Sequence, residues 1–203
     1  MTSFPLTRLA LLATLFIGLT TAHAQPTAEV PFDSTLAAEL EAMHEVDQGG
    51  RKMWHALSAS YDGPVPDSIR GPFWSALSRL DSLHFARLDS IVAVSGWPGR
   101  STVGEDGVRT AFLVVQHAPL EAQERYLPLL EASVAEGEAE AWQLAMLTDR
   151  VLVRRGLPQR YGSQFRVDPE TGERTYDPVE DPARLNARRE AIGLPPHRHL
   201  GGQ

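Results

Sequence analysis

The sequence has no cysteine, few aromatic residues and no long apolar run after its first 24 residues. The absence of cysteine from all 203 residues excludes disulfides and thiolate chemistry, so packing alone must stabilise the fold. Aromatic residues make up 7% of the chain, and 19 basic residues face 26 acidic ones without a basic cluster. Nucleic acid is therefore not an expected partner. No P-loop, dinucleotide-binding or His-Glu-x-x-His motif occurs, so the sequence leaves any cofactor unknown.

Residues 1–24 have the pattern of a signal peptide. Arg8 supplies the positive charge, residues 9–19 are apolar, and Ala22-His23-Ala24 is a small-residue cleavage site. We expect export to the periplasm or the extracellular space after cleavage near Ala24. The apolar run is shorter than the roughly 20 residues of a membrane-spanning helix, so no membrane insertion is expected after cleavage. Removing this segment takes away one charge, that of Arg8, and changes the net charge from −7 to −8.

The rest of the chain is expected to contain a linker (25–32), one helical domain (33–195) and a flexible tail (196–203). Apolar periodicity and glycine or proline breaks predict a helical stretch from residue 34 past Gly49-Gly50, either one kinked helix or two short ones. Four more helices are predicted over 73–96, 103–118, 120–134 and 138–155. Alternation around a turn at 168–172 predicts a hairpin over about 163–177, and a short helix follows over about 182–192. The predicted fold class is mainly α, a compact multi-helix domain with a small C-terminal β-hairpin and a short terminal helix.

Two carboxylates interrupt the apolar stripes of these helices. Asp149 lies one turn from Ala145 and Val153, so its side chain faces protein. Asp47 follows Met43 on the stripe of the first helix, and Arg51 lies one turn later, the ideal spacing for an ion pair within a helix.

The predicted helix 103–118 is apolar on nearly every side, yet it ends in Gln116 and His117. A buried carboxylate must be paired, hydrogen-bonded or protonated, because its unpaired charge is costly. We therefore expect His117, Asp47, Asp149 and the arginines Arg51 and Arg150 to satisfy one another.

Several short segments resemble an uncharacterised bacterial family, a domain of unknown function. The segments are Gly96-Trp97-Pro98, Gln116-His117-Ala118, Asp149-Arg150-Val151 and Pro158-Gln159-x-Tyr161-Gly162-Ser163-Gln164, and the resemblance extends over about residues 40–195. Ser163 stands where members typically have threonine, and His84 where an asparagine is expected. The resemblance implies a mostly helical fold, often with a signal peptide, but no reaction, cofactor or partner.

Three hypotheses follow for the polar groups. In the first, the exported domain binds a small polar ligand or a protein partner in a pocket covered by Trp97 and the loop 161–164. Its ligand-binding residues would be Asp47, Arg51, Trp97, Gln116, Arg150, Gln159, Tyr161 and Gln164. In the second, His117 with Asp149 or Asp47 forms a hydrolase site, as acid and base or as metal ligands, although no metal site is assigned. In the third, the groups form a purely structural network that stabilises helix packing. The sequence leaves open whether the protein is an enzyme.

Overall fold

The computed structural model describes residues 31–168 and 171–200, and their fold is mainly α as predicted. The helices are α1 (Ser34–Ala59), α2 (Asp67–Ser95), α3 (Arg100–His117), α4 (Leu120–Ala135), α5 (Ala141–Arg154) and the short α6 (Leu185–Glu190), which follows a 3-10 turn, Pro182–Arg184. The strands β1 (Phe165–Val167) and β2 (Arg174–Tyr176) pair antiparallel, with Arg166 opposite Thr175. The expected signal peptide, the linker up to residue 30 and the last three tail residues lie outside the described residues.

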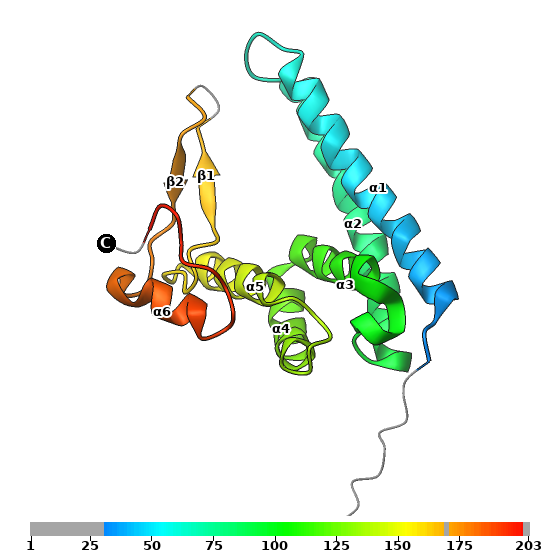
Figure 1. Ribbon diagram of the computed structural model, residues 1–203. Coiled ribbons are helices and arrows are strands. Elements are labelled where there is room, and N and C mark those ends of the chain that lie inside the picture. The colour runs from blue at the N-terminus through cyan, green and yellow to red at the C-terminus, as the bar shows by residue number, and fades with distance from the viewer. Residues whose placement is uncertain (1–30, 169–170, 201–203) are drawn as a thin grey trace, which may run out of the picture.

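Helices α1 and α2 form a long antiparallel arm, which α3 crosses near its base (Figure 1). Helices α4 and α5 follow α3, and the hairpin and α6 lie at the far end of the molecule from the arm. Of the two alternatives for the first predicted stretch, the structure has one helix that continues through Gly49-Gly50. A Cβ at Gly50 would lie 2.8 Å from Leu77 Cδ1, so the missing side chain lets α2 approach α1 closely. Within the described chain, no helix is both long and apolar enough to cross a membrane.

Two helices begin earlier than predicted. Helix α2 begins at Asp67, six residues before its predicted start at residue 73. Pro66 is the N-cap, where it breaks no hydrogen bond within the helix, and Asp67 is favourable at the positive end of the helix. Helix α3 begins at Arg100, and Gly104 interrupts it with a φ of +73°, a conformation that glycine adopts readily.

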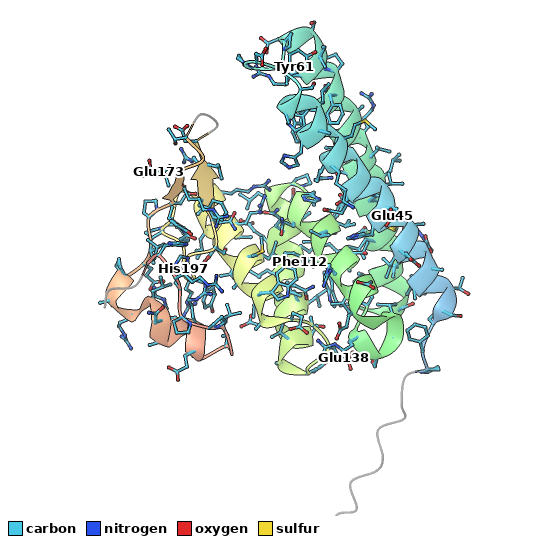
Figure 2. The ribbon with its side chains drawn as sticks, turned by 45° about the horizontal axis from the view of Figure 1, so that its top comes forward. Glu45, Tyr61, Phe112, Glu138, Glu173 and His197 are labelled. Carbon is cyan, nitrogen blue, oxygen red and sulfur yellow. The ribbon has the colours of Figure 1, made fainter. Side chains whose placement is uncertain are left out.

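The core is centred on α3, whose apolar side chains contact the arm on one side and α4 and α5 on the other. Phe112 is fully buried at its middle (Figure 2) and contacts Trp142 edge to face, with ring centroids 5.1 Å apart. The main side chains packed with it are Leu40, Met43, Leu88, Ile91, Val108, Val115, Tyr126, Leu130 and Leu147. This core places the C-terminal end of α3 between the arm and α5, where the candidate site lies.

Gly107 is required where α3 crosses α1. A Cβ there would lie 2.6 Å from Val103 Cγ2 and 3.4 Å from Leu40 Cδ1. We expect Gly107→Ala to lower the free energy of unfolding by about 1–3 kcal/mol through overpacking, as measured by urea unfolding. The matched control is Gly71→Ala in α2, where a Cβ has nothing within 4 Å. This control is expected to change stability by less than about 0.5 kcal/mol, because the helix-forming gain of alanine is offset by its position before Pro72, and an equal loss in both variants would contradict the packing argument.

Candidate functional site

His117 ends α3 and hydrogen-bonds a carboxylate of the arm. Its Nδ1 lies 2.9 Å from Oδ1 of Asp47, a residue 70 positions earlier in α1. Asp47 is only 2% exposed. Because an ionised carboxylate can only accept, Nδ1 carries the proton of this hydrogen bond, and neutral His117 keeps its lone pair on Nε2. The histidine at the end of an apolar helix is thus the partner of a buried carboxylate.

Arg51 joins Asp47 to a second carboxylate, Asp81 of α2. Its Nη1 donates to Asp47 Oδ1 at 2.7 Å, which confirms the ion pair predicted from the i, i+4 spacing. Its Nη2 donates to both oxygens of Asp81, at 3.0 and 3.1 Å. We refer to Asp47, Arg51, Asp81 and His117 as the Asp47 cluster. The cluster connects α1, α2 and α3 by charge as well as by packing.

The surroundings of Asp47 favour its ionised form. Burial by itself raises the pKa of this carboxyl, but the hydrogen bond and charge of His117 and the charge of Arg51 outweigh that effect. Gln48 Nε2 also donates to Asp47 Oδ2, at 2.6 Å. The pKa of Asp47 is therefore lowered from its ordinary value of 3.8, and the cluster holds a carboxylate at neutral pH.

A cavity of about 310 Å³ opens beside the cluster. Its walls come from α2, the junction of α3 and α4, and α5; the lining residues are Ser78, Asp81, Ser82, Phe85, His117, Ala118, Pro119 and Arg154. Since Nδ1 of His117 is engaged by Asp47, Nε2 is the ring nitrogen left for a ligand in this cavity. We call it the His117 cavity.

Two arginines lie one turn apart on α5, Arg154 at the wall of this cavity and Arg150 one turn before it. Arg154 lines the cavity, and its Nη1 donates to the carbonyl oxygen of Ala118 at 3.0 Å. Arg150 is half-buried, and its Nε is buried without a hydrogen-bond partner. Burial, and then the charge of Arg154, lower the pKa of Arg150. Neither guanidinium forms an ion pair with a carboxylate of the described residues, so positive charge here lacks a counterion.

Asp47, Asp81 and His117 also form the one group in the described chain with the make-up of a metal site. Each offers a ligand atom, and the three atoms lie within 4.8 Å of one another. However, the guanidinium of Arg51 already donates to both carboxylates, and Nδ1 of His117 is directed at Asp47. A metal ion would have to replace these contacts and share the space with a fixed cation. The geometry favours arginine as the counterion of the two carboxylates.

Asp149 belongs to a separate network at the end of α5. Its carboxylate is fully buried and accepts four hydrogen bonds from the loop that follows the helix. Oδ1 accepts from the backbone N–H groups of Arg160 (2.6 Å) and Tyr161 (2.9 Å), and Oδ2 accepts from both the backbone N–H and the hydroxyl of Ser163 (2.9 Å each). Asp149 thus holds the loop over α5, and its oxygens are directed at the loop and not at His117.

Gln159 completes this network with its side-chain amide. It is fully buried; Nε2 donates to the carbonyl oxygens of Gln164 and Asp177, and Oε1 accepts from the backbone N–H of Gln164, all at 2.8 Å. Tyr161 is buried in the same loop, where burial raises the pKa of its hydroxyl. The amide of Gln159 replaces main-chain pairing and ties the two ends of the hairpin together.

The structure distributes the predicted site residues among different places and not in one pocket. Trp97 lines a cavity of about 370 Å³ near the start of α3, whereas the loop residues Gly162 and Ser163 line another of about 260 Å³. Neither covers the His117 cavity. Gln116 is buried, its carbonyl oxygen accepts from Gln123 Nε2 at 2.7 Å, and its Oε1 has no partner.

The sequence reasoning missed Asp81 and Arg154. A signal for Asp81 was present, because it lies one turn after the buried Leu77 on the apolar stripe of α2, the same criterion that identified Asp47 and Asp149. Arg154 carried no such signal, since an arginine in the last turn of a helix is ordinary.

A family model described as a family of unknown function, DUF6624, matches residues 34–200. No curated protein and no solved structure matches the chain. The match includes both polar networks and the arm.

Proposed function

Because the chain belongs to a family whose function is unknown, we propose from the site geometry that it binds a small ligand with a carboxylate or phosphate group in the His117 cavity. The observation that carries this proposal is the pair Arg150 and Arg154, two guanidinium groups one turn apart without a carboxylate partner in the described chain. Like charges at this spacing destabilise a helix, and the half-buried guanidinium of Arg150 lacks a counterion, which adds a further cost. An anionic ligand removes both penalties.

The cavity offers complementary groups for such a ligand. Arg154 has further N–H groups besides the one bound to Ala118, and Nε2 of His117 can donate when the ring is protonated. Ser78 and Ser82 add hydroxyls, and Phe85 provides an apolar wall. Arg51 donates to both oxygens of Asp81 and thereby weakens the repulsion between this carboxylate and an anion. The volume of about 310 Å³ fits a small metabolite and not a polymer.

Thermal unfolding with anions tests the proposal. We expect inorganic phosphate or succinate to raise the Tm, by an amount that grows with the logarithm of anion concentration once the site is mostly occupied. Potassium chloride at the same ionic strength gives the reference. Arg154→Gln should abolish at least 90% of the anion-dependent rise.

Arg184→Gln is the control, because Arg184 is exposed and lies outside the cavity lining. It removes the same charge and should leave the response to phosphate unchanged. If neither phosphate nor succinate raises the Tm beyond chloride, or if both variants lose the response equally, the proposal is wrong.

A second candidate function, hydrolysis of such a ligand, is favoured by the Asp47–His117 hydrogen bond. A carboxylate that fixes Nδ1–H leaves Nε2 directed away as a general base for a water molecule. Release of nitrophenol from p-nitrophenyl acetate or p-nitrophenyl phosphate measures this activity. His117→Gln should abolish it, and His55→Gln, a change at an exposed position of α1, should not. Equal rates for wild type and His117→Gln would remove this candidate.

A further inference from the structure

One side of the arm carries an exposed strip of apolar and small residues on α1. Its members are Ala42, Val46, Gly49, Met53 and Ala56, all exposed. The spacing alternates between four and three residues, which is the spacing of the contact positions of a coiled coil. Val46 is 45% exposed and Met53 is 63% exposed, whereas large apolar side chains at the contact positions of a coiled coil are usually buried against a partner helix.

Helix α2 carries a second strip with the same spacing. Its members are Ile69, Phe73, Ala76, Leu80 and Leu83, of which Leu83 is 66% exposed. The two strips lie on the same side of the arm, because each continues into one partner of an ion pair. Arg87, four residues after Leu83, donates from Nη2 to Oε2 of Glu39 at 2.8 Å, and Glu39 lies seven residues before Val46. We call the combined surface the outer strip.

The outer strip is complementary to itself. The Glu39–Arg87 ion pair and the contact of Trp54 with Phe73, with ring centroids 5.0 Å apart, fix the register of the two helices. This register places Gly49 and Ala76 at the same height along the arm. A Cβ built at Gly49 has nothing within 4 Å, so the surface there is open.

A two-fold axis perpendicular to the arm at this height pairs large side chains with large ones. Val46 then lies opposite Met53 of a second copy, and Phe73 lies opposite Leu80 of that copy. Ile69 and Leu83 meet in the same way farther out. The small residues Gly49 and Ala76 lie on the axis, where two helices approach most closely.

The charges along α1 also suit an antiparallel copy. Its first half carries Glu41 and Glu45, and its second half carries Lys52 and His55. Glu45 lies on the arm (Figure 2) and precedes the strip residue Val46, and Lys52 follows Glu45 by seven residues, one coiled-coil repeat. The same two-fold axis brings Glu45 of each copy beside Lys52 of the other, so that two ion pairs form across the interface.

We propose that the outer strip binds a second copy of this chain, so that the two arms form an antiparallel four-helix bundle. The partner is a second copy because the apolar pattern and the charge pattern share one symmetry centre, at Gly49. The strip lies on α1 away from the buried side that carries Asp47, so this proposal does not depend on ligand binding in the His117 cavity.

Cysteine cross-linking tests the geometry, since the chain has no cysteine of its own. In the chain without residues 1–24, Gly49→Cys should give a disulfide-linked dimer on mild oxidation, because the two introduced thiols meet near the axis. Gly63→Cys at the tip of the arm is the matched control, as a Cβ there also has nothing within 4 Å. The two tips of an antiparallel pair are roughly 40 Å apart, from about 1.5 Å per residue, so this variant should stay monomeric on the gel. Cross-linking of both variants to the same extent, or of Gly63→Cys alone, overturns the proposal.

The second test measures dimer dissociation by sedimentation equilibrium in variants that reverse the charges of Lys52 and Glu45. The wild type should sediment as a dimer, Lys52→Glu should raise the dimer dissociation constant at least tenfold, and the double variant Lys52→Glu, Glu45→Lys should restore it. Both sites are exposed, so folding is not at risk. A wild type that is monomeric at 100 μM, or a double variant as weak as the single one, overturns the proposal and leaves the strip to another partner.

Discussion

Asp149→Ala is expected to lower the free energy of unfolding by about 4 kcal/mol, the largest effect of a single polar substitution in this protein. The variant removes the acceptor of four hydrogen bonds and leaves the backbone N–H groups of Arg160, Tyr161 and Ser163 without their partner. Hydrogen bonds to a charged group each contribute about 1.5–3 kcal/mol, although the contributions within one network do not add fully. Thermal unfolding should show a Tm lower by roughly 8–16 °C.

Asp149→Asn gives a sharper version of the same experiment. The amide keeps the shape, but its NH₂ group must face N–H donors on one side, so a loss of about 3 kcal/mol is expected. Asp106→Asn is the control, since Asp106 is exposed and its change should stay within about 0.5 kcal/mol. If Asp149→Asn were as stable as the wild type, the carboxylate would be retained at a cost to stability, and a ligand-binding role for the loop 160–163 would be favoured over a structural one.

The helices were predictable where apolar periodicity and chain breakers agree. Helices α3, α4 and α5 lie within three residues of their predicted limits, because Pro119 and Gly137 separate stretches of strong periodicity. The hairpin was predictable from alternation around its turn. The start of α2 was not, because Pro66 and Gly71, which usually mark a loop, stand at the N-cap and inside the first part of the helix.

The sequence identified the buried carboxylates of the site but not all of their hydrogen-bond partners. A carboxylate on an apolar stripe shows that it must be satisfied, and this identified Asp47 and Asp149 from sequence. It does not show by what. Arg51, one partner of Asp47, was predictable from its i, i+4 spacing, but His117 is 70 residues away, and Asp149 is satisfied mainly by backbone N–H groups, which every residue except proline possesses. The sequence therefore suggested one cluster where the structure has two.

Asp47→Ala is expected to cost about 3 kcal/mol at neutral pH, because it leaves Arg51 and His117 without their shared, buried acceptor. The loss should depend on pH. The pKa of Asp47 is lowered in the folded chain, so its stabilisation is fully present above the ordinary pKa of 3.8 and is lost as the pH falls through the lowered value. Urea unfolding of wild type and variant from pH 7 to pH 2.5 should give two curves that converge at the acid end. Parallel curves would show that the carboxylate contributes by packing and not by charge.

The double variant Asp47→Leu, Arg51→Met separates a structural role from a positioning role. Replacing both partners of a buried ion pair by apolar residues is often neutral for stability, and Asp81 borders the His117 cavity, where water can still reach it. We therefore expect the double variant to recover most of the stability that Asp47→Ala loses. If Asp47 also positions His117, the phosphate-dependent rise in Tm of the double variant should be at least tenfold smaller than that of the wild type, because the imidazole is no longer oriented. Recovery of both stability and anion binding would reduce the Asp47 cluster to a packing device and leave Arg150 and Arg154 as the only basis of the anion site.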